Sequence, residues 1–162
     1  MSGHTYFSCW VHIIWCASNR FAFFDERQSK ALSRYLTNYA KSKNISMRIN
    51  FVNPEHVHVL VEVRPSMSVE QMVKLLKGSS SYWINKTGMT KTPFSWQRGY
   101  AALSVSPQVV KTVTRYIAMQ RTHHSRVPFE TELDQMAPGW LASWRETVET
   151  VSGISDVTFP PG

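Results

Sequence analysis

Two closely spaced histidines, and a tyrosine followed by a glutamine, are the residues of this sequence best suited to chemistry. His56 and His58 flank a single valine. Alternate residues of an extended strand share one face, so both imidazoles project to the same side, with backbones about 6.6 Å apart. Imidazole nitrogens at this spacing can converge on one divalent cation. The alternative is a pair of exposed histidines without a metal, and the pair by itself leaves both interpretations open.

Tyr116 and Gln120 stand four residues apart in a segment with helical spacing, which places them on one helix face. A tyrosine hydroxyl has an ordinary pKa of about 10 and attacks a phosphodiester only when it is deprotonated or assisted by a metal. A glutamine oxygen is a hard ligand that suits Mg²⁺ or Mn²⁺. The alternative is an amphipathic helix with an aromatic and an amide residue at its edge.

Hydrophobic periodicity predicts the elements that must position these residues. We expect strands over residues 5–17, 45–52, 56–63 and 100–105, and helices over residues 24–42, 68–83, 107–121, 129–136 and 141–151. The β-α-β-β-α-β order of the first six elements is ferredoxin-like and predicts an α+β fold with an antiparallel sheet and two helices on one face. The other face carries the histidines and is left open for a ligand, a partner or the added C-terminal helix with Tyr116.

The charge of the chain is unevenly distributed. The 162 residues carry 18 Lys and Arg against 11 Asp and Glu, but residues 130–162 hold only one basic residue and six acidic ones. The strongly basic body favours a polyanionic partner such as nucleic acid, with a basic domain lacking such a partner as the alternative. We expect Cys9 and Cys16 to be free, buried thiols, as in a reducing cytoplasm, and we expect no targeting or membrane-spanning segment.

Five stretches spread over about residues 5–135 share their order with a known group of enzymes. They are His12–Cys16 with Asn19 and Arg20; Pro54–Val61; Leu76–Ser80; Trp96–Tyr100 leading into Ser104–Ser106; and Tyr116 and Ile117 with Gln120, His123, His124 and Phe129. In this order they resemble the single-tyrosine transposases of the His-hydrophobic-His (HUH) endonuclease superfamily. Those enzymes come from small bacterial insertion sequences that transpose as single-stranded DNA.

The resemblance implies a role for each candidate residue. His56, His58 and Gln120 are expected to bind the divalent metal, Mg²⁺ or Mn²⁺, and Tyr116 to attack the DNA. The expected products are a 5′-phosphotyrosine and a free 3′-hydroxyl, and attack by another 3′-hydroxyl rejoins DNA. The implied partners are single-stranded DNA with hairpins at insertion-sequence ends and a second copy of the chain in a homodimer, with no membrane and no nucleotide cofactor.

The resemblance also implies a catalytic domain over residues 1–136, followed by an acidic tail over 137–162, in the cytoplasm of a bacterium or archaeon. Basic side chains near the site are candidates for DNA phosphate contacts, with a solvated basic surface as the alternative; they are Lys74, Lys77, Arg98, Lys111, Arg115 and Arg121. Three other functions stay open: a domesticated single-strand nickase, a non-catalytic module that binds single-stranded nucleic acid, and an inactive dimeric relative.

Overall fold

A four-stranded antiparallel sheet forms the centre of the fold. The computed structural model describes residues 4–124 and 126–140. The sheet order is β2-β3-β1-β4, with bounds β1 Trp10–Cys16, β2 Ser46–Val52, β3 His56–Glu62 and β4 Ala101–Val105. The α1 helix (Glu26–Ser42) connects β1 to β2, and α2 (Val69–Lys86) connects β3 to β4. The predicted antiparallel α+β sheet is therefore confirmed, although β1 begins at Trp10 rather than at residue 5.

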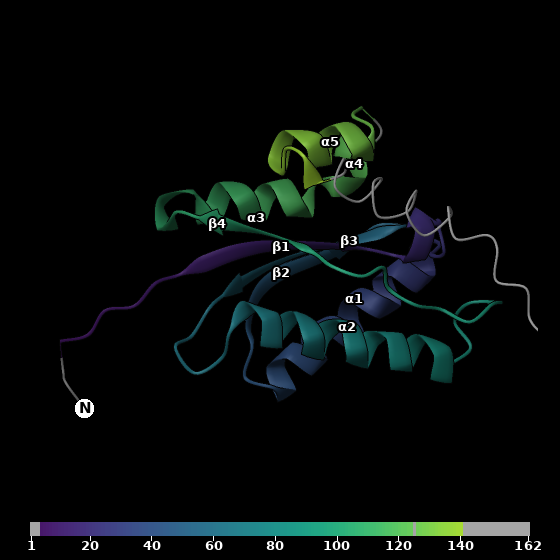
Figure 1. Cartoon of the computed structure of the whole chain (residues 1–162), viewed down its shortest axis with the longest axis horizontal. Coiled ribbons are helices and arrows are strands. Elements are labelled where there is room, and N and C mark those ends of the chain that lie inside the picture. The colour runs from purple at the N-terminus through teal and green to yellow at the C-terminus, as the bar shows by residue number, and fades with distance from the viewer. Residues whose placement is uncertain (1–3, 125, 141–162) are drawn as a thin grey trace, which may run out of the picture. The chain divides into compact units, whose positions relative to one another are not determined.

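Both connecting helices cover one face of the sheet (Figure 1). The valines of β3 face them, because Val57, Val59 and Val61 belong to the same buried cluster as residues of both helices. The helix residues in this cluster include Leu32, Leu36, Met72 and Leu76. Burying such side chains is worth roughly 1.5–3 kcal/mol each, so this packing sets which face of β3 points away from the helices.

Capping boxes determine where α1 and α2 begin. The Asp25 side chain accepts a hydrogen bond from the Gln28 backbone N–H, and the Gln28 side chain accepts one from the Asp25 N–H. Ser68 and Gln71 make the same exchange at α2. Reciprocal caps satisfy amide groups that a helix start leaves open. α2 runs one turn beyond the predicted end near residue 83, because the additional turn buries Ile84.

A bulge in β2 changes which apolar residues share a face. Strict alternation would place Met47 and Ile49 on the same side of the strand, but the pairing register with β3 shifts between them. Met47 consequently packs with the cluster under α1 and α2, whereas Ile49 and Phe51 pack on the opposite face. A bulge adds one residue to one strand and reverses the side-chain alternation beyond it.

The predicted helix over 107–121 is divided into three pieces. They are a 3₁₀ turn η2 (Pro107–Val109), α3 (Val110–Ala118) and α4 (Gln120–His124). Figure 1 shows α3 on the face of the sheet opposite α1 and α2. There Val110 and Ile117 form a second buried cluster with Leu60 and Val105. The face predicted to be open thus receives the added helix, and the bulge in β2 supplies Ile49 and Phe51 to pack against it.

The chain forms two compact units, Met1–His123 and His124–Gly162. In the second unit, α5 (Phe129–Met136) has the predicted bounds, with Glu130 and Glu132 in its first turn. The expected helix over 141–151 lies outside the described residues, and the expected domain boundary after residue 136 stays a prediction. No helix in the described ranges is long and apolar enough to cross a membrane.

Candidate active site

Strand β3 presents His56 and His58 on the sheet face that α3 also occupies. Leu60, which continues their face of the strand, packs with Ile117 of α3. Both histidines are fully buried. The strand periodicity therefore predicted the correct face of the sheet. The alternative of two exposed histidines without a metal does not hold, because both side chains are buried.

The two imidazoles converge. Nε2 of His56 lies 3.0 Å from Nε2 of His58, with the rings inclined at 73°. Two ligand atoms at right angles around a cation, each about 2.1 Å from it, are separated by about 3.0 Å. The spacing of these nitrogens therefore matches adjacent positions around one octahedral divalent cation.

Each histidine has a further polar partner. Nδ1 of His56 lies 3.0 Å from Oε1 of Glu55, and Nδ1 of His58 lies 2.9 Å from Nε2 of His12. The amide nitrogen of Asn53 donates to Nε2 of His56 at 2.9 Å, so this partner lies at the converging nitrogen and not at the remote one. Partners at the ring nitrogen remote from a metal orient imidazole ligands and select their tautomer. Both histidines can thus direct Nε2 to a common point.

The sequence patterns assign no role to His12, which stands only within one of the resembling stretches. His12 is buried, and burial lowers its pKa to about 4, so the ring is neutral near pH 7. Strand alternation carried a signal: Val11, Ile13 and Trp15 belong to the cluster under α1 and α2. His12 must therefore face the histidine side of the sheet.

Cys16 lies directly across from His56 in the β1–β3 register. Burial is the largest effect on its thiol and raises the pKa to about 12. A neutral thiol is neither a strong nucleophile nor a ready metal ligand. Both cysteines are free, as predicted, but Cys9 is exposed and the expectation that both thiols are buried was wrong for it.

Tyr116 brings a hydroxyl-bearing ring to the histidines. The ring centroid lies 6.2 Å from that of His58 and 6.3 Å from that of His12, edge to face in both cases. The ring packs against the cluster that includes Ile117, its neighbour on α3. The structure thus brings together His12, His56, His58 and Tyr116 from three separate elements.

Gln120 lies just beyond a break in the helix. The predicted single helix ends at Ala118, and Met119 adopts φ −97° and ψ 13°. The Met119 N–H bonds to the carbonyls of both Arg115 and Tyr116, which tightens the last turn of α3. Gln120 then opens α4 with its side chain fully buried. The continuous helix behind the i, i+4 argument was wrong, and the role of Gln120 as a ligand stays a prediction.

The six predicted DNA-contacting residues do not form one group. Lys111 and Arg115 are exposed on α3, the helix that carries Tyr116. Arg121, on α4, donates to the carboxylate of Glu26 in α1 at 2.9 and 2.6 Å. Hydrogen bonds from Arg121 and then from Lys30 lower the pKa of Glu26 to about 2. The other three lie elsewhere: Arg98 is exposed in the loop before β4, and α2 carries Lys74 and Lys77.

Lys77 anchors the loop before β4. Its ammonium donates to the backbone carbonyls of Gln97 at 2.7 Å and Gly99 at 2.8 Å. Burial lowers the pKa of this ammonium, as expected where water is partly excluded. Gly99 has a φ of +81°, a conformation that favours glycine. The contacts of Lys77 support a structural role in holding this turn.

Replacing Lys77 by methionine keeps the apolar stem and removes both hydrogen bonds. We expect Lys77→Met to lower the free energy of unfolding by about 1–3 kcal/mol, because two carbonyls lose a charged donor. Urea denaturation measures this effect, with the exposed Lys74→Met on the same helix as control. Unchanged stability together with weakened DNA binding would assign Lys77 to phosphate contact instead.

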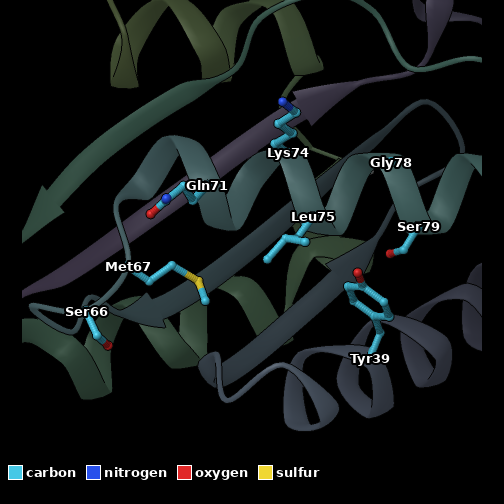
Figure 2. A pocket seen from close by; sticks show the side chains of 8 residues that line it. All are labelled: Tyr39, Ser66, Met67, Gln71, Lys74, Leu75, Gly78 and Ser79. Carbon is cyan, nitrogen blue, oxygen red and sulfur yellow. The ribbon is translucent and has the colours of Figure 1, made fainter.

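A cavity of about 540 Å³ lies away from the histidines. Figure 2 shows its lining side chains, which come from α1, α2 and the segment before α2. They include Tyr39, Met67, Lys74 and Leu75, but neither histidine and not Tyr116. Because α1 and α2 cover the other face of the sheet, this cavity does not contribute to the chemistry of the histidine site.

The converging groups can perform one kind of chemistry. Two imidazole nitrogens at 3.0 Å supply adjacent positions for a divalent cation. A tyrosine beside them could supply an oxygen nucleophile, which such a cation would activate. Together these groups suit nucleophilic attack on a phosphodiester.

Comparison with known proteins identifies related sequences. The family described as "Transposase IS200 like" matches residues 5–120. A transposase of insertion sequence element IS200 from Salmonella typhimurium is 30% identical over 123 residues, covering 72% of this chain and 80% of the relative. The ISDra2 transposase TnpA of Deinococcus radiodurans is 25% identical over 114 residues, covering 67% and 81%.

Two solved structures share the fold. A putative transposase from Deinococcus radiodurans superposes with a TM-score of 0.59 at 23% identity, covering 74% of this chain and 96% of that one. A REP-associated tyrosine transposase bound to a REP hairpin superposes with a TM-score of 0.56 at 14% identity, covering 78% and 76%. At these identities the likeness establishes the architecture of the sheet and its helices.

Proposed function

The chain belongs to the IS200-like transposase family and is a transposase, and we propose that it cuts and rejoins single-stranded DNA with Tyr116 as its nucleophile. The observation that carries this proposal is the placement of the Tyr116 ring 6.2 Å from that of His58, whose Nε2 converges with that of His56. A nucleophile and a candidate metal pair thus share one site.

We propose that His56, His58 and Gln120 hold one divalent cation, Mg²⁺ or Mn²⁺. The donor set fits, because two imidazole nitrogens stand 3.0 Å apart and the buried Gln120, which begins α4, lies four residues after Tyr116 in the sequence. A cation held by these residues would supply polarisation of the scissile phosphate and would offset the charge that develops on it. Glu55 and His12 orient the two imidazoles, and the burial of His56 and His58 shields them from bulk water.

Tyr116 performs the covalent step in this proposal. Its hydroxyl loses a proton and its oxygen forms a bond to phosphorus, while the bond from phosphorus to the 3′-oxygen breaks. That oxygen takes up a proton and becomes a free 3′-hydroxyl, and the 5′-phosphate remains on Tyr116. Attack by the 3′-hydroxyl of another strand reverses these bond changes. The phosphotyrosine link retains the phosphodiester energy, so no nucleotide cofactor is required.

We propose that the DNA substrate carries hairpins near the ends of an insertion sequence. Support comes from the solved neighbour bound to a REP hairpin and from the exposed Lys111 and Arg115 beside Tyr116. The cytoplasm of a bacterium or archaeon, where cellular DNA lies, is the proposed compartment. We also propose a homodimer, since β4 is an edge strand of the described sheet and can pair with another strand. Light scattering on the purified chain tests the dimer.

A covalent-trapping assay tests the proposed function. The full chain is mixed with 3′-end-labelled single-stranded DNA from the flanks of its own gene, with Mn²⁺ or a chelator, and separated on a denaturing gel. We expect a labelled protein band with Mn²⁺ and none with chelator or with fully duplex DNA. A native complex without a covalent band on any strand would favour the non-catalytic binding module. Cleavage only of strands unrelated to its own flanks would favour the domesticated nickase.

A further inference from the structure

His12 occupies the middle of β1, between β3 and β4. It pairs across the sheet with Leu60 on one side and Leu103 on the other. Only 3% of the residue is exposed. Its ring stacks on that of His58, with centroids 5.1 Å apart and planes inclined at 27°, and its Nε2 lies 2.9 Å from Nδ1 of His58. The two rings in contact therefore come from neighbouring strands, His12 from β1 and His58 from β3.

We propose that His12 is a positioning residue, which accepts a hydrogen bond from Nδ1–H of His58 and thereby directs the Nε2 lone pair of His58 to the cation. This inference rests on the proposed function, because it assigns His58 as a metal ligand. It adds a residue from a third element to the metal site.

The tautomer of His58 depends on which ring donates the hydrogen between Nε2 of His12 and Nδ1 of His58. Two ring nitrogens at 2.9 Å share a single hydrogen. When His12 donates it, neutral His58 must carry its own proton on Nε2 and cannot coordinate there. When His58 donates it, Nε2 of His58 is free to bind a cation, and the proton of His12 lies on its Nδ1. Coordination through the converging nitrogens therefore requires His12 to be the acceptor.

The other histidine has a corresponding arrangement. Oε1 of Glu55 lies 3.0 Å from Nδ1 of His56, and a carboxylate there accepts the Nδ1 proton. Each proposed ligand thus has its own acceptor at the ring nitrogen remote from the cation, a carboxylate for His56 and a neutral imidazole for His58. Such partners set the tautomer and orientation of metal-binding histidines.

Two substitutions separate the hydrogen bond of His12 from its bulk. His12→Phe keeps a ring of similar shape without an acceptor, and His12→Gln retains an amide oxygen that can accept at the same reach. Mn²⁺ affinity of the full chain, measured without DNA by electron paramagnetic resonance, is the readout. We expect His12→Phe to weaken binding about 10- to 100-fold, and His12→Gln to stay within about threefold of the wild type.

The matched control is Leu103→Ala, the cross-strand neighbour of His12 on the same sheet face, which removes packing but no hydrogen bond. It should leave Mn²⁺ affinity within about threefold. Equal Mn²⁺ affinity in His12→Phe and the wild type would overturn the role of His12 and leave the metal site standing. Equal losses in the two His12 variants would also overturn it. A wild-type chain that binds no Mn²⁺ would overturn both the metal site and this inference.

Nitrogen NMR of the wild-type chain reports which ring nitrogen of His58 carries the proton. This measurement does not depend on whether a variant folds. With Mg²⁺ bound, we expect His58 to carry its proton on Nδ1 and to show a coupling across the hydrogen bond to Nε2 of His12. A proton on Nε2 of His58 in the Mg²⁺-bound state would overturn the inference, whatever the variants do.

Discussion

Replacing Tyr116 by phenylalanine is expected to abolish the covalent protein–DNA product and to lower strand cleavage by at least about 10⁴-fold. Removing a catalytic nucleophile has effects of this order or larger, because the remaining groups cannot provide the bond to phosphorus. Phenylalanine preserves the ring that packs with Val113 and Ile117 and lies edge-on to His58. The loss is therefore expected without a change in folding, and single-turnover cleavage of end-labelled DNA measures it.

The control for this experiment is Tyr100→Phe. Tyr100 is partly buried and packs with the cluster under α1 and α2, on the other face of the sheet. This variant should cleave at the wild-type rate, and both variants should bind the same hairpin DNA with affinities within about threefold. Continued cleavage at the wild-type position by Tyr116→Phe, with label still attached to protein, would assign the nucleophile to another residue.

Removing either His56 or His58 is expected to lower metal-dependent cleavage by about 10³-fold, since a bound cation contributes several kcal/mol to stabilising the charge at phosphorus. In the proposed site these two Nε2 atoms, 3.0 Å apart, share one cation. The double variant should therefore be no more than about tenfold slower than either single variant, because residues acting as a unit have non-additive effects. Cleavage rates of the two single variants and the double variant over a range of Mn²⁺ concentrations measure this.

His4→Ala is the control for the histidine series, because His4 is exposed and precedes β1. It should leave both the rate and the Mn²⁺ dependence unchanged. Circular dichroism of every variant shows whether the sheet persists after a buried imidazole is removed. If the double variant folds and its loss of cleavage rate equals the product of the two single losses, a shared cation is contradicted. Separate roles for the two imidazoles would then be favoured.

Local sequence patterns predicted much of this fold for identifiable reasons. The alternation of β3 placed the valines against helices and both histidines on the opposite face, because side chains of a strand alternate with a period of two. Ser68 and Gln71 exchange hydrogen bonds only three residues apart, so the start of α2 was readable from a short segment. Apolar spacing alone placed the start of α1 at residue 24, two residues before Glu26. The fold class and the candidate residues followed from such patterns and from the resemblance.

Other features required the tertiary structure, since they depend on contacts between residues far apart in sequence. Alternation within β2 gave no sign of the bulge after Met47, which the pairing with β3 reveals. The break at Met119 interrupts a segment whose spacing is helical throughout.

His12 shows most clearly where sequence reasoning ends. The sequence by itself determined that His12 is in a strand and that His56 and His58 share a face. Only the antiparallel register of β1 with β3 brings His12 to 2.9 Å from His58, 46 positions along the chain. A strand's period determines which face a side chain occupies, whereas its register determines which residues it meets there, and a register shift of one residue changes every such contact.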